Sequence, residues 1–205
     1  MKGRKTIKLV QAATGAIALT LLMQLMGVFG YGQYTWMCFL PLLMFFAFGA
    51  DFKKIPEMLV SYAAGEVWCV INSLVMGVFV SAFGADNMVM SNIVPTILVI
   101  FCILTTHENL LEGKICSNVP CVFMGLATSF FTFMLQQPIN FGHLFAFWAF
   151  GIALAVCLVM SGTLVCSAIF GKERTIQALT PLAVLEAQQN LSLIHISEPT
   201  RRSYI

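Results

Sequence analysis

Six apolar runs, separated by short polar connections, occupy most of the chain and restrict what it can fold into. A helix needs about 20 apolar residues to cross the hydrocarbon core of a bilayer, and backbone in lipid must satisfy its hydrogen bonds within the helix. The fourth run is the shortest, unless residues 88–90 extend it. We predict an all-α, polytopic membrane helix bundle with six spans at about Leu9–Phe29, Tyr34–Ala50, Leu59–Phe83, Asn92–Thr105, Val119–Gln136 and Leu144–Phe170.

The composition agrees with a membrane protein. Hydrophobic residues make up 59% of the 205 residues and charged residues 10%, and the mean hydropathy is +0.88. A soluble domain has about a quarter charged residues. The formal net charge of +2, with no basic cluster interleaved with aromatic residues, argues against nucleic acid as a partner.

The basic residues predict the orientation of the spans. They lie in alternate connections: before span one, between spans two and three, between spans four and five, and after span six. The other three connections, 30–33, 84–91 and 137–143, contain no Lys or Arg. Because basic residues favour the cytoplasmic side, this alternation predicts six spans with both termini in the cytoplasm. A count of four or five spans would place some of these basic residues on the side of the membrane opposite the cytoplasm.

Span three contains Glu66, an acidic residue inside an apolar run. At 100° per residue, a polar and small stripe lies on one face of this helix and apolar residues lie opposite. A charged group at such depth is costly unless it faces protein, water or a partner. Either Glu66 is a proton- or cation-sensing position in a pathway, or its protonated carboxyl hydrogen-bonds a neighbour such as Gln24, Thr128 or Thr132. The stripe consists of Tyr62, Glu66, Cys69, Ser73, Gly77 and Ser81.

Span five has a comparable stripe: Cys121, Gly125, Thr128, Ser129, Thr132 and Gln136. We expect the two stripes to pack together, and we name as substrate-pathway candidates Glu66, Cys69, Ser73, Thr128, Ser129 and Thr132. The small residues favour close helix packing, and the polar ones also fit simple interhelical hydrogen bonds.

An internal repeat that relates the unit of spans two and three to the unit of spans four and five is one of two open interpretations, and the other is chance similarity. A shift of 60 residues superposes Lys54 on Lys114, Ile55 on Ile115 and Gly65 on Gly125. Each unit crosses the membrane twice, so a true repeat would be parallel. Paired short helices of this kind point to a midplane site in transporters.

No pattern in the sequence predicts an enzyme, a metal site or a cofactor. Nucleotide-binding, zinc-protease and hydrolase motifs are missing. His107 lies near Glu108 and Glu112, but adjacent residues do not share a helical face, so we expect a solvated interfacial loop. His143 is expected to cap span six. The seven cysteines fit small apolar packing positions.

The C-terminal part divides into two segments. Residues 172–190 predict a short cytoplasmic tail after the membrane domain of residues 1–171. Leu191 to Arg201, LSLIHISEPTR, resembles the translation of a transposase adapter used in library preparation. We therefore treat residues 191–205 as an artefact of cloning or assembly that carries no function.

Three short motifs resemble a known family. They are FFAFG at the end of span two, Gly65-Glu66-Val67-Trp68 in span three, and Val119-Pro120-Cys121-Val122-Phe123-Met124-Gly125 at the start of span five. Over roughly residues 9–170 the chain resembles the bacterial inner-membrane proteins grouped as domain-of-unknown-function family 1097. The resemblance implies a small multi-pass protein of the inner (cytoplasmic) membrane and no established activity.

Two functions follow as hypotheses. The first is a small-solute permease or channel subunit with a path lined by the stripes of spans three and five; because six spans make a slim bundle, it includes a homo-oligomer with a shared pore. The second is a structural or assembly protein of the lipid bilayer without transport activity. A water-accessible cavity that reaches Glu66 from one side would distinguish them.

Overall fold

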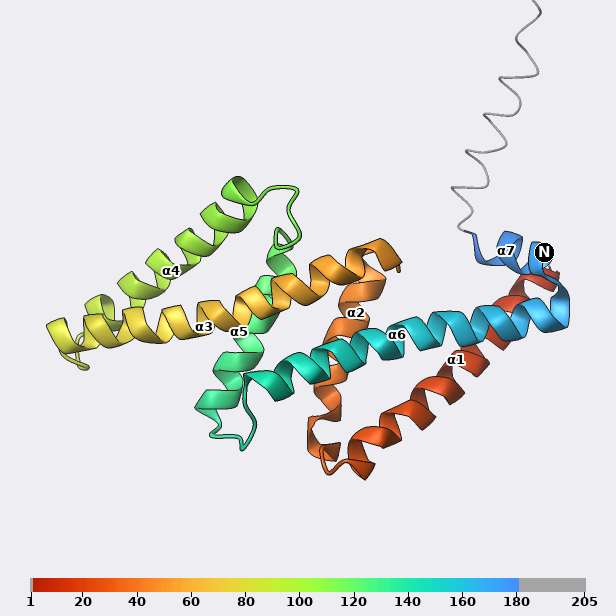
Figure 1. The fold of residues 1–205 in the computed structure, drawn as a ribbon, viewed down its shortest axis with the longest axis horizontal. Helices are drawn as coiled ribbons and strands as arrows, with labels where there is room; N and C mark the ends of the chain where they lie inside the picture. Colours follow the sequence, from red (N-terminus) through yellow and green to blue (C-terminus); the bar gives the residue numbers. More distant parts are fainter. Residues whose placement is uncertain (1, 181–205) are drawn as a thin grey trace, which may run out of the picture. The chain divides into compact units, whose positions relative to one another are not determined.

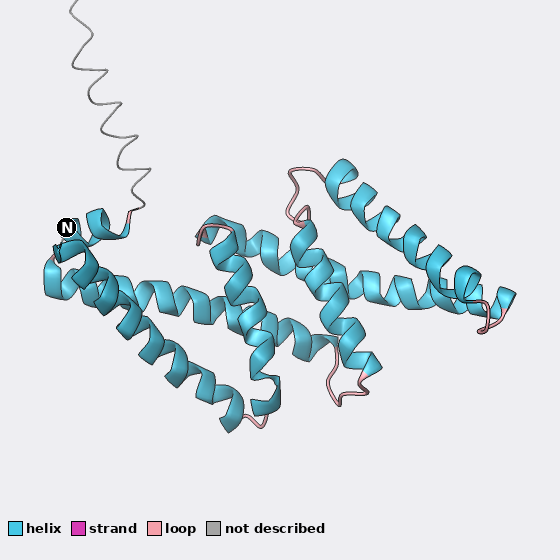
Figure 2. Cartoon of the chain, turned by 180° about the vertical axis from the view of Figure 1, so that it is seen from behind, coloured by secondary structure: helices cyan, strands magenta, loops and turns pink. Residues whose placement is uncertain are grey.

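The computed structural model describes residues 2–180, so the adapter-like segment lies outside the described residues. The described residues form helices joined by loops, with no strand among them (Figure 2). The chain divides into two units, one of residues 1–22 and 157–205 and the other of residues 23–156. Each unit is described by itself.

The larger unit contains most of the helices (Figure 1). It also includes the end of α1 (Lys2–Val28) and the start of α6 (Phe141–Phe170). Its other elements are η1 (Gly32–Cys38), α2 (Phe39–Ala47), η2 (Phe52–Lys54), α3 (Ile55–Phe83), η3 (Val89–Ile93), α4 (Val94–Leu104), η4 (Thr105–Leu110) and α5 (Val119–Met134).

All six predicted spans are helical. Among the described residues, four helices are long and apolar enough to cross a membrane: Gly3–Val28, Phe52–Phe83, Val89–Leu110 and Phe141–Phe170. The fourth predicted span is longer than its apolar run because the η3 turns extend it to Val89. The second and fifth spans correspond to the shorter apolar helices Gly32–Ala47 and Val119–Met134. At 1.5 Å per residue, the 16 residues of α5 rise about 24 Å, less than the roughly 30 Å hydrocarbon core.

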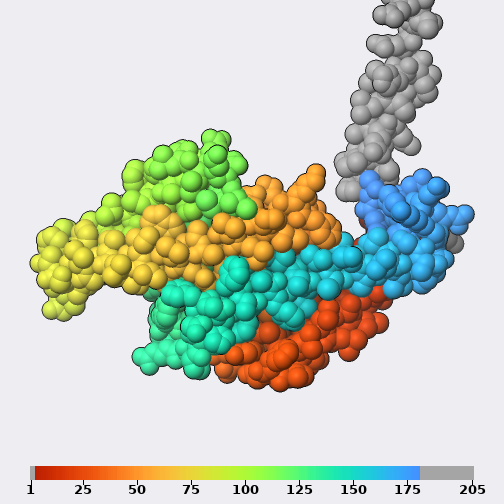
Figure 3. Space-filling model, viewed as in Figure 1, coloured from red at the N-terminus to blue at the C-terminus, as the bar shows by residue number. Residues whose placement is uncertain are grey.

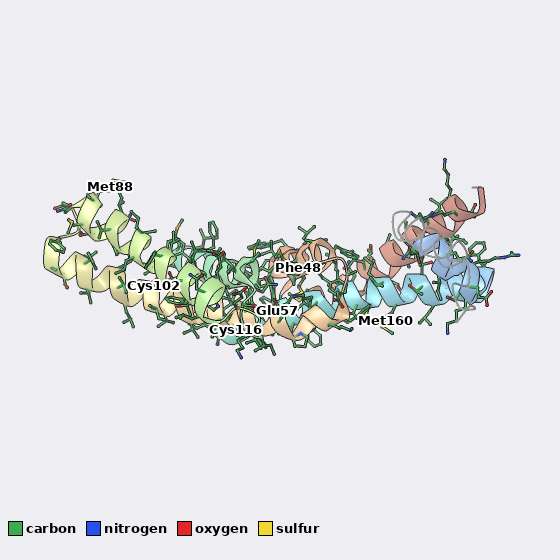
Figure 4. All side chains as sticks on the ribbon, turned by 90° about the horizontal axis from the view of Figure 1, so that it is seen from above. Phe48, Glu57, Met88, Cys102, Cys116 and Met160 are labelled. Atoms are coloured by element: carbon green, nitrogen blue, oxygen red, sulfur yellow. The ribbon has the colours of Figure 1, made fainter. Side chains whose placement is uncertain are left out.

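Local chemistry sets several helix boundaries. Gly84 ends α3 at φ +81°, a left-handed conformation that favours glycine, and the chain then turns back into η3 and α4. Met88 lies in this turn, at the far end of α3 in Figure 4. Asn118 begins α5, because its side-chain oxygen accepts a hydrogen bond from the backbone N–H of Cys121 at 3.2 Å. Pro120 follows in the first turn, where its missing N–H costs nothing.

The core of the larger unit is built on α3. The helix α5 crosses it, and η3 and α4 lie along it (Figures 1 and 3). Val99 and Ile103 of α4 and Val122 of α5 form a buried cluster, against which residues of α3 pack. The Trp148 ring of α6 stacks on Tyr62 with centroids 4.2 Å apart and donates a hydrogen bond to the carbonyl of Met58.

The smaller unit packs α1 against the second half of α6 and against α7 (Lys172–Leu179), which is the first part of the predicted tail. Ile7, Cys166 and Ala178 are its buried cluster. A Cβ at Gly162 would lie 2.7 Å from the side chain of Gln11, so α1 and α6 approach closely there.

The structure corrects the expectation for one histidine and adds a second capping residue to the expectation for another. His107 does not lie in a solvated loop: η4 continues α4, and its wider turn buries His107 to 2% exposure against α3. At the start of α6, the Asn140 side chain accepts the backbone N–H of His143 at 3.1 Å, and the backbone N–H of Asn140 contacts Nδ1 of His143 at 3.4 Å, so both residues take part in the cap. The other ring nitrogen of His143, Nε2, contacts the hydroxyl of Tyr31 at 3.0 Å.

Candidate functional site

The helices α3 and α5 cross at a pair of glycines, Gly65 and Gly125. A Cβ placed on Gly65 would collide with the carbonyl oxygen of Val122 and lie 2.8 Å from the backbone nitrogen of Leu126. A Cβ on Gly125 would collide with the carbonyl oxygen of Tyr62. The two backbones are therefore in direct contact, and no other residue type fits at either position without moving a helix.

The contacts at this crossing are reciprocal. Gly65 faces Val122 and Leu126, and Gly125 faces Tyr62 and Glu66. Each contact is matched by one whose members differ by 60 in number: 65 with 125, 62 with 122, and 66 with 126. The crossing is thus locally two-fold symmetric in the register of the predicted repeat.

Buried polar residues of α3 and α5 form a row beside the crossing, and hydrogen bonds connect part of this row. The Tyr62 hydroxyl and the Thr128 Oγ1 are 2.7 Å apart. Thr128 also donates to the carbonyl of Met124, and Thr132 donates to the carbonyl of Thr128. The row, which we call the α3–α5 polar row, consists of the buried residues Tyr62, Glu66, Cys69, Cys121, Thr128, Ser129 and Thr132.

Two members of the row have buried atoms without a partner. Glu66 is 8% exposed and its Oε1 makes no hydrogen bond to any described residue; Ser129 is 0% exposed and its Oγ makes none either. The Oε1 atom of Glu66 does not form the expected bond to Thr128 or Thr132, and both of these hydroxyls donate to backbone carbonyls of α5. A buried polar atom without a partner is rare in native proteins and indicates a strained, functional or water-filled position.

The outer half of each predicted stripe is not part of the row. Ser73, Gly77 and Ser81 are exposed, and Ser73 donates to the carbonyl of Cys69 in its own helix. Gln136, at φ +49°, is also exposed. The pathway candidates therefore separate into five buried residues, Glu66, Cys69, Thr128, Ser129 and Thr132, and the exposed Ser73.

A cavity of about 170 Å³ opens at one end of the row. Its wall includes Thr132, but Glu66 is not among its lining residues. The helix α5 and the segment η1 form its sides, and Tyr34 in that wall contacts Gln137 through its hydroxyl at 3.1 Å. The lining residues are Gln33, Tyr34, Trp36, Met37, Phe131, Thr132, Leu135 and Gln137.

A second, mainly apolar cavity of about 470 Å³ lies between α3, α4 and α5. Asn72, Asn92 and Thr96 are the polar residues of its wall. Asn72 and Thr132 differ by 60 in number and each lines one of these two cavities, in keeping with the symmetric crossing.

A hydrogen-bonded chain fixes the other side of α3. Trp68 Nε1 donates to Nε2 of His107 at 2.9 Å, so this ring nitrogen is the acceptor and the proton of the neutral ring lies on Nδ1. Nδ1 then donates to the carbonyl of Cys116 in the loop before α5. His107 thus ties α3, η4 and that loop together, which makes it a positioning residue for the crossing.

Sequence reasoning did not identify Trp148, Ser61 or Asn118 as neighbours of the row. Trp148 is 90 residues from its partner Met58, and no periodicity connects them. Ser61 accepts the backbone N–H of Asn118, which joins the starts of the buried segments of α3 and α5. Ser61 was detectable in principle, because it lies on the same helical face as Gly65.

Within residues 2–180, no group of three His, Cys, Asp or Glu side chains lies close enough to hold a metal ion. The free cysteines of the row, Cys69 and Cys121, are buried. The chemistry that the row offers is therefore that of one carboxyl group and several hydroxyl groups at intramembrane depth.

The family model described as "Protein of unknown function (DUF1097)" matches residues 9–171. No curated protein and no solved structure matches the chain.

Proposed function

The chain belongs to the DUF1097 family, and from that premise we propose that it is a small-solute permease or channel subunit of the bacterial inner membrane, with its path along the α3–α5 polar row. The apolar helices make it a membrane protein. The inner-membrane location follows the resemblance to bacterial proteins of this group, and the transport role follows the geometry of the row.

The observation that carries the proposal is the buried Oε1 atom of Glu66, which has no hydrogen-bond partner among the described residues. Insertion of an acidic side chain at the centre of a membrane helix costs roughly 3 kcal/mol, and a buried polar atom without a hydrogen bond adds to that cost. The Oε1 atom of Glu66 forms no hydrogen bond with any described residue that would offset this cost. A purely structural carboxyl would have a partner, so the position fits one that receives a proton, a cation or water during a transport cycle.

The topology that we propose has six spans and cytoplasmic termini. The alternation of basic residues supports it, and so do the two shorter helices, which have the apolar character of spans although their length is marginal. Single cysteines at Lys54 and Lys114, treated with a membrane-impermeant thiol reagent, should be labelled from the same side. Labelling from opposite sides would exclude the six-span arrangement.

The reciprocal crossing supports a parallel repeat of the units η1–α2–α3 and η3–α4–α5. Transporters commonly place their sites at the interface of such repeats, near the bilayer midplane. Gly65 and Gly125 lie at that interface, with Glu66 directly beside them.

The described conformation is closed at the crossing, and neither of the two cavities beside it supplies the water-accessible route to Glu66 that would distinguish transport from a structural role. The cavity at one end of the row reaches Thr132 and does not include Glu66, and backbone contact at the glycine pair leaves no opening there. A path to Glu66 therefore requires α3 and α5 to separate, as in a gated rather than a permanently open channel.

The glycine contact also favours a second candidate, a structural or assembly protein. Backbone-to-backbone packing of small residues is a common way to fix helices in membranes. In that case the α3–α5 polar row would contribute only to the packing of the two helices. Removal of the Glu66 carboxyl would then change the stability of the protein without changing any flux.

The test compares Glu66→Gln with Glu57→Gln in proteoliposomes that contain a trapped pH dye. Glu57 is a matched control because it lies on the same helix but forms an ion pair with Lys54 at 2.8 Å. With a proton gradient or a sodium gradient as the driving force, we expect dye-reported flux with the wild type and with Glu57→Gln, and its loss with Glu66→Gln.

Equal flux in both variants would exclude a role for Glu66 in transport. No flux from the wild type, together with identical solute uptake by cells with and without the gene, would favour the structural function.

A further inference from the structure

The smaller unit contains a basic cavity that the transport proposal does not use. Its volume is about 490 Å³, and it lies where the first turns of α1 meet α7. Its wall consists of Gly3, Arg4, Ile7, Arg174, Gln177 and Ala178. Two arginines and one amide thus face one space, and none of its lining residues within 2–180 is acidic.

One arginine is held in position by the end of α7. Arg4 Nε donates to the carbonyl of Ala178 at 3.1 Å, and Arg4 Nη2 donates to the carbonyl of Thr180 at 2.6 Å. The carbonyls at a helix C-terminus carry partial negative charge, which favours this arrangement. The guanidinium is therefore preorganised at the cavity wall.

The other arginine has no partner in the described part of the chain. Arg174 is exposed and forms no ion pair or hydrogen bond there, and the neighbouring Glu173 does not pair with it. The helix α7 is buried at Thr175 and Ala178, and its residues Arg174 and Gln177 line the cavity. Two guanidinium groups without an acidic counter-charge are a suitable receptor for a phosphate group.

The surroundings favour a phosphate that is part of a lipid. Ile7 and Ala178 give the cavity an apolar side, and the apolar run of α1 begins within one helical turn of Ile7. A bound molecule would thus contact guanidinium groups at one end and a lipid-exposed helix at the other. Basic clusters at the ends of membrane helices also attract anionic lipids.

We propose that this cavity binds the phosphate group of an anionic phospholipid in the leaflet next to the basic connections. The guanidinium groups of Arg4 and Arg174 and the amide of Gln177 hold the headgroup, and the acyl chains extend along α1. This site does not depend on any transport activity of the α3–α5 polar row.

Native mass spectrometry of the purified full chain tests the site, with phosphatidylglycerol and phosphatidylcholine of identical acyl chains as probes. We expect the wild type to retain phosphatidylglycerol preferentially. Arg174→Gln should weaken its apparent affinity about five-fold, the factor typical of one basic residue near a membrane surface. Lys172→Gln removes the same charge from the same helix but from a residue that does not line the cavity, and we expect it to change the affinity much less.

A further variant separates a folding defect from loss of the site. Gln177→Glu places a negative charge in the cavity wall and should weaken phosphatidylglycerol at least as much as Arg174→Gln, while circular dichroism confirms that helix content is retained. Equal losses in Arg174→Gln and Lys172→Gln would show diffuse attraction and overturn the proposal. Displacement of the lipid by an equimolar amount of inorganic phosphate would assign the cavity to free phosphate and overturn it as well.

Discussion

The inner and outer halves of the polar stripe on α3 lie on the same helical face but have opposite environments. Tyr62, Glu66 and Cys69 are buried against α5, whereas Ser73 and Gly77 are exposed. The cause is the length of the partner: α5 has 16 residues and α3 has 29. A stripe of small and polar residues therefore identifies a helical face, but the neighbouring helix determines how much of that face becomes a site.

The largest expected effect tests the two glycines of the stripe against each other. Gly65→Val places side-chain atoms where the Val122 carbonyl lies, and overpacking of this kind should lower the free energy of unfolding by about 3 kcal/mol. Gly77→Val meets open space and should change it by no more than about 0.5 kcal/mol. Unfolding in mixed detergent and SDS micelles measures both. Equal losses would mean that the crossing does not lie at Gly65.

A smaller effect of opposite sign is expected at Glu66. Glu66→Leu removes a buried oxygen that has no hydrogen-bond partner, so it should raise the free energy of unfolding by about 1 kcal/mol. In Glu57→Leu the oxygen that is lost has a partner in Lys54, so no gain is expected there. The same titration in SDS checks the pair. Destabilisation by Glu66→Leu would reveal a partner that the described residues do not provide.

The hydrogen bond between α3 and α5 should contribute less. Tyr62→Phe removes the contact with Thr128, whose hydroxyl keeps its bond to the Met124 carbonyl. The loss should therefore be about 0.6 kcal/mol, the average for interhelical hydrogen bonds in membranes. A double-mutant cycle with Thr128→Val isolates the pair, and a coupling energy of zero would contradict the contact.

The smallest effect is expected in the outer half of the stripe. Ser73 is exposed and bonds only its own helix, so Ser73→Ala should alter stability by less than about 0.5 kcal/mol and should leave flux unchanged. A flux defect in this variant would extend the path beyond the buried row.

Sequence periodicity was sufficient to predict the helices and the pairing of the two stripes. Glu66, Cys69, Thr128, Ser129 and Thr132 are buried on facing helices, as the 100° spacing predicts. The family resemblance over residues 9–170 is confirmed by the match to residues 9–171. The reciprocal contacts of Gly65 and Gly125 follow the 60-residue shift seen in the sequence.

Other features depend on contacts that no local pattern records. The stacking of Trp148 on Tyr62 joins residues far apart in the chain. The burial of His107 depends on the wider turns of η4, which change the face on which it lies. The exposure of Ser73 depends on where α5 ends, and the apolar run of that span gave only an approximate boundary.

The most direct test of the account is to lock α3 to α5 and to measure flux. The backbone nitrogen of Asn118 lies 3.2 Å from the Oγ of Ser61, so cysteines at these two positions, in a variant without the seven native cysteines, can be joined through disulfides to a short bis-methanethiosulfonate reagent. If the two helices must separate to open the path, proteoliposomes should show little flux when the cross-link is formed and normal flux after reduction. Full flux through quantitatively cross-linked protein would contradict it.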